Sequence, residues 1–311
     1  MLKVRFVCLF TVLRPRLYYR LMLELKPFLA QNSMAVATRY PVIIIGGAED
    51  KTGECTILKA FFESAGGRGA KIGIIPCASR EPTLVGTRYY DIFTGMGAQQ
   101  VQVLDIRYRS ECDEPRWLDM LGGCTGVFIT GGDQLRLHEL IGGTPLMRAI
   151  KDGIKEKDLV VAGTSAGAAI MGEDMIAGGS SGESPNQSLV DLTKGLGIVP
   201  ELLVDQHFHN RNRMARLLSA IAAHPNRLGV GIDEDTSIAL TGDGSFEVIG
   251  KGSITIVDPG DMTHTSYQSA SYDTNGQTAP ISLHNLTVHI LKHGDYFDYK
   301  RRKVLSPQLV S

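Results

Sequence analysis

The sequence predicts an α/β protein with a mainly parallel sheet, helices on both of its faces and a strand-rich carboxyl-terminal part. Short, wholly apolar segments alternate with stretches of helical spacing between residues 41 and 223, which is typical of parallel strands joined by right-handed crossovers. The apolar segments lack alternating polar positions, as expected of strands buried on both faces. From 237 to 290 the runs are short and alternating instead, which indicates antiparallel strands.

The expected elements follow in order along the chain. The first strand covers 41–45, where a β-branched run stops at Gly46-Gly47. The first helix covers 52–64, where apolar residues recur at helical spacing before Gly66-Gly67. Further strands are expected at 71–76, 101–104, 126–130 and 158–163, and further helices at 89–96 and 214–223. Ligands of such sheets bind beyond the carboxyl ends of the strands, so the functional site is expected there.

The composition excludes several classes of protein. The 311 residues include 32 basic and 33 acidic side chains, 43% hydrophobic residues and 35 glycines, which excludes a disordered, collagen-like or coiled-coil chain. The net charge of −1 creates no global field that attracts nucleic acid, so no nucleic-acid partner is expected. The five cysteines contain no C-x-x-C pair, and their odd number leaves one thiol that no disulfide within the chain could include. This favours a reduced compartment and hence the cytoplasm.

The amino-terminal segment differs from the rest in composition, because residues 1–33 contain six basic residues and one acidic residue. The apolar run at 4–13 is too short to span a bilayer, and Arg14-Pro15-Arg16 stands where a signal peptide has a small-residue cleavage site. A non-native or upstream-start extension, a surface or membrane-lying helix and a targeting segment are the open interpretations. We expect a basic extension at 1–38 without catalytic residues, one α/β domain at 39–300 and a tail at 301–311.

A candidate nucleophile follows the strand expected at 158–163. Residues 163–167 read G-T-S-A-G, and small helix-forming residues come next. A tight strand-to-helix turn requires small neighbours, and it presents a serine hydroxyl above the sheet at a helix amino end. Ser165 is therefore the predicted nucleophile, and N–H groups at this helix end, that of Ala166 among them, are expected to stabilise an oxyanion. The alternative is that the small residues only let the helix pack close to the sheet.

A base and an orienting carboxylate are available at the ends of two later apolar runs. His207 follows the run at 202–204, and Glu234 lies in the acidic cluster that ends the run at 229–232. Both ends should lie at the sheet edge that displays Ser165. His207 as base and Glu234 as orienting acid would complete a serine-type catalytic set.

Other interpretations of the histidines stay open. They could be structural. Asp205, His207 and His209 share one face of an extended segment and could ligate a metal, but the arginines that follow would repel a divalent cation, so no metal is expected. In an α/β-hydrolase, the catalytic histidine would follow the nucleophile and the acid along the chain. Three late histidines are available there but lie in or beside a strand pattern and look structural: His284, His289 and His293.

Three arginines lie at the amino end of the helix expected at 214–223: Arg211, Arg213 and Arg216. Cations in this place oppose the helix dipole and one another, so we expect them to cost stability unless they bind an anion. A solvated basic face is one interpretation. The functional interpretation is a carboxylate-binding surface beside the base, and it predicts that alanine at these positions leaves stability unchanged or raises it.

Two glycine-containing turns follow other strands. Gly131-Gly132 lets backbone N–H groups approach a substrate, so Gly132 is the expected second oxyanion donor, although a plain strand-end turn is equally consistent. The turn at 46–51 reads G-G-A-E-D-K and contains neither of the glycine motifs that bind nucleotide phosphates. We expect no cofactor.

Five segments together resemble the cyanophycinase family of serine exopeptidases, which is similar in fold to aspartyl dipeptidase and to the class I glutamine amidotransferases. The segments are GGAEDK at 46–51, TGGDQLRL at 130–137, GTSAGA at 163–168, DQHF with trailing arginines at 205–216 and GIDEDT at 231–236. The resemblance implies cleavage of cyanophycin, a polyaspartate with arginine joined to each side-chain carboxyl, into β-Asp-Arg dipeptides. It also implies a homodimer.

The resemblance further implies roles for individual residues. It makes Ser165 the nucleophile, His207 the base and Glu234 the acid. It places six residues in the substrate pocket: Gln134, Asp205, Gln206, Arg211, Arg213 and Arg216. Glutamine amidotransferases use a cysteine at the elbow, and no cysteine lies near 165, which argues against that activity. A related serine peptidase for small α-aspartyl peptides and a non-catalytic binding protein are the alternatives.

Overall fold

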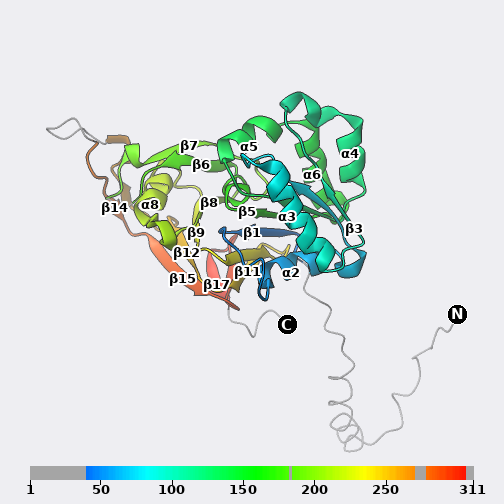
Figure 1. The fold of residues 1–311 in the computed structure, drawn as a ribbon. Helices are drawn as coiled ribbons and strands as arrows, with labels where there is room; N and C mark the ends of the chain where they lie inside the picture. The colour runs from blue at the N-terminus through cyan, green and yellow to red at the C-terminus, as the bar shows by residue number, and fades with distance from the viewer. Residues whose placement is uncertain (1–39, 182–183, 270–277, 306–311) are drawn as a thin grey trace, which may run out of the picture. The chain divides into compact units, whose positions relative to one another are not determined.

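A nine-stranded mixed sheet is the main feature of the part of the chain that the computed structural model describes, residues 40–181, 184–269 and 278–305 (Figure 1). From edge to edge its strands are β17 (Lys303–Leu305), β16 (Tyr296–Asp298), β11 (Ser245–Gly250), β10 (Thr236–Leu240), β1 (Val42–Ile45), β5 (Val160–Thr164), β4 (Gly126–Ile129), β2 (Lys71–Ile75) and β3 (Gln100–Val103). The amino-terminal extension expected at 1–38 lies outside the described residues.

One half of this sheet is parallel, as predicted. β3, β2, β4, β5 and β1 pair in parallel, with Gly163 opposite Ile44 on one side and Ile129 on the other. β1, β4 and β5 are buried along their whole length, which explains their unbroken apolar sequences. Because these strands run in the same direction, their carboxyl ends lie at one edge of the sheet.

The other half is antiparallel, as expected for the strand-rich carboxyl-terminal part, and because it joins the same sheet, the sheet is mixed and not mainly parallel. β10 pairs antiparallel with β1, and β11, β16 and β17 continue in the same way. Short turns join β10 to β11 and β16 to β17, and such turns allow only antiparallel pairing. β17 also extends the sheet beyond residue 300, where the tail was expected to begin.

A second sheet of four strands brings further carboxyl ends to the site. Its order is β15 (Thr287–Lys292), β12 (Ser253–Asp258), β9 (Leu228–Ile232) and β8 (Leu202–Gln206), and β8 and β9 are parallel. Val204 of β8 packs in the core shared with the large sheet, whereas its neighbour Leu203 packs with residues of α8 (Met214–Ala223). Two small sheets complete the strands: β6 (Asp174–Gly179) with β7 (Val190–Lys194), and β13 (His264–Thr265) with β14 (Leu283–His284).

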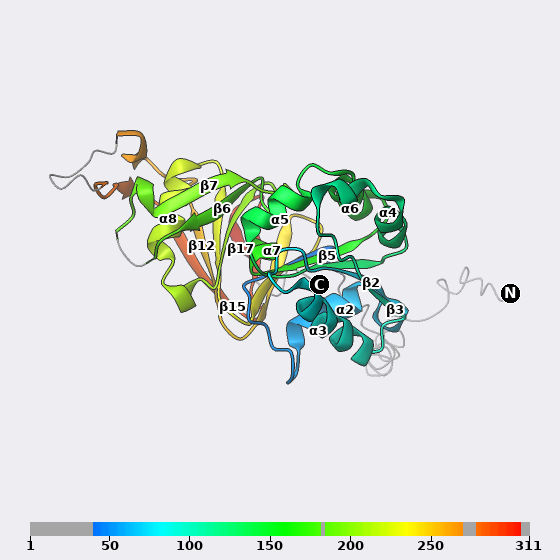
Figure 2. The same cartoon turned by 45° about the horizontal axis from the view of Figure 1, so that its top comes forward.

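Helices cover both faces of the nine-stranded sheet, as predicted (Figure 2). α2 (Thr56–Ser64) and α3 (Pro82–Gly95) pack on one face, where the ring centroids of Phe61, Phe93 and Phe128 lie 5.3, 5.4 and 5.5 Å apart. The other face carries α4 (Pro115–Gly122), α5 (Gln134–Ile141), α6 (Pro145–Glu156) and α7 (Ala166–Ala169). Within the described ranges, every helix is too short or too polar to span a bilayer.

The first helix begins four residues later than the sequence pattern suggests. The Asp50 carboxylate accepts hydrogen bonds from the N–H groups of Gly53, Thr52 and Cys55, at distances of 2.8, 3.1 and 3.2 Å. These bonds lower the pKa of Asp50 to about 2. They hold residues 50–55 in a turn, so α2 begins only at Thr56.

Candidate active site

Ser165 lies in the turn between β5 and α7, directly after the carboxyl end of β5. Its φ of 53° and ψ of −111° lie outside the regions that L residues prefer, so the turn is strained. Small neighbours make this turn possible, because a Cβ at Gly163 would collide with the backbone oxygen of Gly167, and one at Gly167 with that of Ile129. The Ser165 N–H donates to the carbonyl of Ile45 at 3.0 Å. The geometry agrees with the strand-to-helix turn that the sequence predicts.

A chain of hydrogen bonds runs from Ser165 to Glu234. The Ser165 Oγ is 3.0 Å from Nε2 of His207, and Nδ1 of His207 is 2.6 Å from Oε1 of Glu234. The His207 side chain is 9% exposed, whereas that of Glu234 is 36% exposed. A carboxylate can only accept, so Nδ1 carries the proton in this pair and Nε2 offers its lone pair to the hydroxyl. The arrangement can therefore take a proton from Ser165.

The surroundings of His207 favour its neutral form. Burial lowers the pKa of the imidazole below its ordinary value of 6.5, and the positive charges of Arg211 and Arg213 lower it further. The hydrogen bond to Glu234 acts in the opposite direction and raises this pKa. The net direction is downward, so the imidazole is unprotonated at neutral pH and can act as a base.

The oxyanion donors predicted from the sequence are the backbone N–H groups of Gly132 and Ala166. Gly131 lies so close that a Cβ there would be 3.1 Å from the Cβ of Ser165. Gly132 has a φ of 148°, and the next N–H, that of Asp133, donates to the carbonyl of Ala78 at 2.9 Å, which fixes the turn. In the described part of the chain, no backbone carbonyl accepts from the N–H of Gly132 or of Ala166. Both groups are therefore available to a substrate oxygen.

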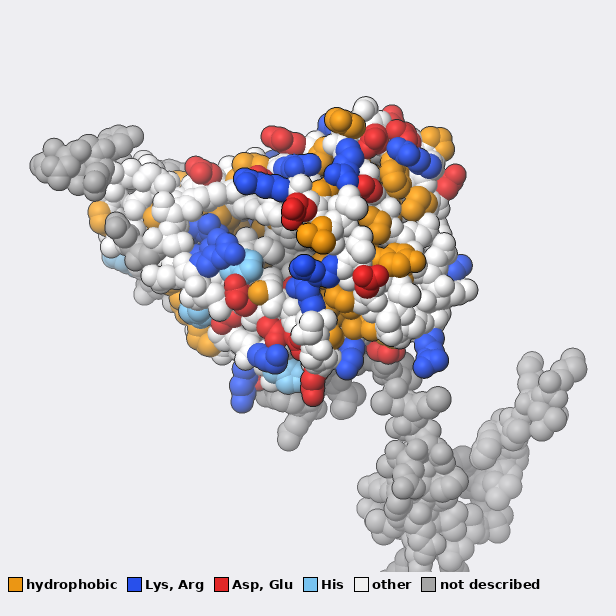
Figure 3. All heavy atoms as spheres, in the orientation of Figure 1, with side chains coloured by type: hydrophobic (Ala, Val, Ile, Leu, Met, Phe, Trp, Pro, Cys, Tyr) orange, Lys and Arg blue, Asp and Glu red, His pale blue; other side chains and the backbone are white. Residues whose placement is uncertain are grey.

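Three of the residues expected in the substrate pocket have side chains near this site or on its surface. The Gln206 Oε1 is 3.4 Å from the Ser165 Oγ. Gln134, the first residue of α5, donates through Nε2 to the carbonyls of Ala177 and Ile176, at 2.7 and 3.2 Å. Arg211 is exposed. On the face shown in Figure 3, basic, acidic and histidine side chains gather beside one another over the region of β8, β9 and α8.

The other three form a buried ionic group. Arg216 donates through Nε to the Asp205 carboxylate at 2.8 Å and through Nη2 to its second oxygen. Arg213 donates to the same carboxylate at 3.3 Å and to the carbonyl of Gln206. Asp205 is 1% exposed and Arg216 is 4% exposed. Burial lowers the pKa of Arg213 to about 10, which still leaves it charged at neutral pH.

This pairing bears on two expectations. We expected the arginines to oppose one another at a helix end unless they bind an anion, and for Arg213 and Arg216 the Asp205 carboxylate of the protein itself is that anion. We also placed Asp205 and His207 on one face. The φ of 48° at His207 ends the extended conformation, so Asp205 lies on the α8 side of β8 while His207 turns toward Ser165.

The change of backbone direction at His207 also separates the three residues that could have ligated a metal. Asp205 binds Arg216, His207 binds Glu234, and Nδ1 of His209 is 3.0 Å from Oδ1 of Asp233. Residues 40–181, 184–269 and 278–305 contain no group of three His, Cys, Asp or Glu side chains that could hold a metal ion. The late histidines His284 and His289 contact the rings of His264 and Phe297 instead of Ser165.

The turn at 46–51 has a structural role that the sequence reasoning missed. The Gly46 carbonyl accepts the N–H of His207 at 2.8 Å, and the Gly47 carbonyl accepts that of Asp235 at 2.9 Å. The Glu49 carboxylate, whose side chain is 1% exposed, accepts the hydroxyl of Thr164 at 2.6 Å. This turn therefore contacts all three segments that carry Ser165, His207 and Glu234. The GGAEDK motif is its only sequence signal; it lacks the nucleotide-binding glycine pattern and is one of the segments that resemble the cyanophycinase family, but neither observation predicts this contact.

Comparison with known proteins identifies the family. Residues 42–248 match the model of peptidase family S51. The chain belongs to this family. It is 54% identical to a cyanophycinase of Trichormus variabilis over 86% of this chain and 89% of that protein. It is 52% identical to a cyanophycinase of Geminocystis herdmanii over 86% of this chain and 97% of that protein. It is 49% identical to a cyanophycinase of Synechococcus elongatus over 91% of this chain and 86% of that protein. The resemblance noted in the sequence is thereby confirmed.

A solved structure has a similar fold. The crystal structure of a peptidase from an acI-B1 Actinobacterium superimposes with a TM-score of 0.55 and covers 84% of this chain and 98% of that chain. The two sequences are 19% identical, so this likeness concerns the fold alone.

We predict that Gly47→Ala in this S51 peptidase lowers kcat about 100-fold with little change in KM. Gly47 has a φ of 102°, and a Cβ there would lie 2.5 Å from both Cε1 and Nε2 of His207, so a methyl group must push the imidazole away from Ser165. A displacement of about 1 Å in such a site costs on the order of 10²-fold in rate. Steady-state kinetics on the proposed polymer substrate would measure it.

Gly97→Ala is the matched control for this variant. Gly97 has a similar φ of 92°, and nothing lies within 4 Å of the Cβ that would be added. Both variants should lose about 1–2 kcal/mol of stability from the left-handed backbone. Only Gly47→Ala should lose activity and react more slowly with a fluorophosphonate. Equal kcat in the two variants would contradict the positioning role of Gly47.

Proposed function

We propose that this chain is a serine-type exopeptidase that degrades cyanophycin to β-Asp-Arg dipeptides. The hydrogen-bond chain Ser165–His207–Glu234 is the observation that carries the proposal. Relatives about half identical to this chain over most of their length bear the name cyanophycinase, which supports the choice of substrate. In this proposal Ser165 is the nucleophile, His207 the base and Glu234 the orienting acid.

The reaction follows from the position of the three side chains. As His207 accepts the hydroxyl proton, the Ser165 Oγ attacks the carbonyl carbon of an aspartyl backbone peptide bond. The carbonyl oxygen becomes an oxyanion, which the N–H groups of Gly132 and Ala166 stabilise, each donor contributing about 3–4 kcal/mol. His207 then gives the proton to the leaving amine. A water molecule, deprotonated by His207, finally hydrolyses the acyl-enzyme ester.

The substrate-binding residues divide into two groups in this proposal. Gln134, Gln206 and Arg211 contact the polymer, because their side chains lie at the site or on its surface. The second group does not contact the polymer and supports the site through buried ion pairs that hold β8 and α8 together: Asp205, Arg213 and Arg216. Mixed charge around the site suits a polymer that carries both carboxylates and guanidinium groups.

Four further features are part of the proposal. A class I glutamine amidotransferase-like fold is supported by the parallel half-sheet with the candidate nucleophile at the end of β5. A cytoplasmic location is supported by the four free cysteines of the described ranges. A single peptidase domain from about 39 to the end of β17 and a homodimeric assembly complete the proposal; the homodimer rests on the resemblance to the family.

Incubation with cyanophycin tests the function directly. We expect soluble β-Asp-Arg dipeptide as the product and no requirement for added metal or cofactor. Turnover of small α-aspartyl dipeptides without release of β-Asp-Arg would favour the aspartyl dipeptidase alternative. Failure of a fluorophosphonate to label Ser165 would favour a non-catalytic binding protein.

We predict that the acid limb of the kcat/KM profile lies below pH 6.5 and moves with the charges around His207. Arg211 lowers the pKa of His207, so Arg211→Ala should raise this pKa and move the limb to higher pH. Glu234 raises the pKa of His207, so Glu234→Gln should move the limb to lower pH, together with a large fall in kcat. The profile of kcat/KM against pH measures both shifts.

Arg301→Ala is the control for the limb position, because Arg301 is exposed and pairs only with Asp298 among the described residues. It should leave the limb in place. Shifts of the same sign in Arg211→Ala and Glu234→Gln would show that His207 is not the titrating base.

A further inference from the structure

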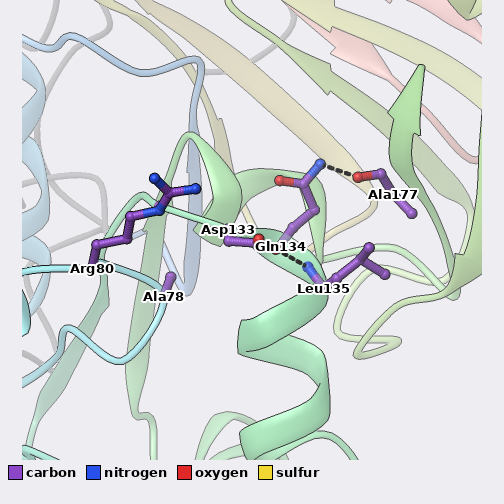
Figure 4. A pocket seen from close by; sticks show the side chains of 7 residues that line it. Ala78, Arg80, Asp133, Gln134, Leu135 and Ala177 are labelled. Carbon is purple, nitrogen blue, oxygen red and sulfur yellow. Dashed lines mark hydrogen bonds between the residues drawn. The ribbon is translucent and has the colours of Figure 1, made fainter.

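A pocket of about 470 Å³ opens beside the Gly131-Gly132 turn. It is lined by Ala78, Arg80, Gly132, Asp133, Gln134, Leu135 and Ala177 (Figure 4). The turn also contacts the nucleophile, since a Cβ at Gly131 would be 3.6 Å from the Ser165 Oγ. A substrate whose carbonyl oxygen lies at the N–H of Gly132 therefore extends into this pocket with the groups next to its scissile bond.

Two polar side chains of the pocket are already engaged by the protein. The Gln134 amide nitrogen donates to the carbonyls of Ala177 and Ile176, so the amide oxygen is left as an acceptor. The Asp133 Oδ1 accepts the N–H groups of Leu135 and Arg136 at 2.9 and 3.1 Å and caps α5.

Arg80 is the remaining charged side chain of the pocket lining. It lies across the pocket from Gln134 and Ala177 (Figure 4). Its side chain is exposed, and no carboxylate of the described residues lies within ion-pair distance of its guanidinium. The two residues before it are held in place, because Ala78 accepts the N–H of Asp133 at 2.9 Å and the Ser79 N–H donates to the carbonyl of Pro76 at 3.0 Å. The pocket thus offers a guanidinium without an ion-pair partner among the described residues, opposite one fixed amide oxygen.

We propose that Arg80 binds the free α-carboxylate of the arginyl branch next to the scissile bond, while the Gln134 Oε1 accepts an N–H group of the same branch. A guanidinium binds a carboxylate through two parallel hydrogen bonds, which gives orientation as well as affinity. Every arginine of cyanophycin is joined through its amino group and so retains its α-carboxylate. The inference rests on the proposed function and makes Arg80 a specificity-determining residue for it.

A pair of synthetic substrates tests this contact. One is a short β-Asp-Arg oligomer, and in the other agmatine replaces the arginine next to the scissile bond, which removes only the carboxylate. The wild type should prefer the first by about 10- to 100-fold in kcat/KM, the usual effect of one charge-assisted contact. Arg80→Ala should lose that preference, because its kcat/KM falls for the arginine-containing oligomer and stays at the wild-type value for the agmatine analogue. Arg80→Lys should recover the preference in part.

Arg88→Ala is the matched control, since Arg88 is an exposed arginine of α3 outside the pocket lining. It should retain the full preference. An Arg80→Ala variant that keeps the preference, or that loses activity on both substrates equally, overturns the role of Arg80 while the proposed function stands. A wild-type protein that hydrolyses neither substrate overturns the proposed function and this inference with it.

Discussion

Ser165→Ala is expected to lower kcat on cyanophycin by about 10⁴-fold or more while the protein still folds and binds substrate. The Oγ is the atom that forms the acyl bond, and its neighbours cannot replace it. The hydroxyl is small and lies at the surface of the turn, so its loss leaves no large cavity. Initial rates of dipeptide release, substrate binding and the thermal midpoint would measure the three quantities.

Ser110→Ala provides the control, because Ser110 is an exposed serine in the 3-10 helix Arg109–Asp113. It should leave rate, binding and stability unchanged. Activity of Ser165→Ala within about tenfold of wild type would exclude Ser165 as the nucleophile.

Arg216→Ala is expected to lower the free energy of unfolding by about 3–5 kcal/mol, the usual cost of removing one partner from a buried ion pair. The Asp205 carboxylate is 1% exposed and would retain only the Arg213 contact at 3.3 Å. Replacing the whole ionic group by apolar residues removes every buried charge, so Asp205→Leu combined with Arg213→Met and Arg216→Met should regain most of the loss. Urea unfolding would measure both changes.

Arg211→Ala is the matched control for stability. Arg211 belongs to the same arginine cluster but is exposed, so its removal should change the free energy of unfolding by less than about 0.5 kcal/mol. Arg216→Lys should fall between Arg216→Ala and the wild type, because an ammonium makes one contact where the guanidinium makes two. Equal stability of Arg211→Ala and Arg216→Ala would contradict the buried pairing.

Local chemistry was enough to predict much of the secondary structure and the candidate catalytic set. The apolar run at 41–45 predicted β1, and the spacing at 214–223 predicted α8 with its observed bounds. The small residues around Ser165 predicted its strand-to-helix turn, because only such residues fit where Gly167 contacts Ile129. His207 and Glu234 were chosen as strand-end residues, and the structure brings them within hydrogen-bond distance; their catalytic role stays a prediction.

The tertiary structure alone decided which side chains meet across the chain. Period-two alternation placed Asp205 with His207, but the φ of 48° at His207 turns the two apart, and Arg216 then neutralises Asp205 beneath α8. The alternating runs after 237 indicated antiparallel strands, but that β10 pairs with β1 and joins the parallel half to the antiparallel half depends on long-range contacts that no local pattern encodes. The contact of Gly47 with the imidazole likewise joins residues 160 positions apart, so nothing near Gly47 in the sequence could indicate it. Local propensity determines the elements of this protein, and the packing of distant segments determines its site.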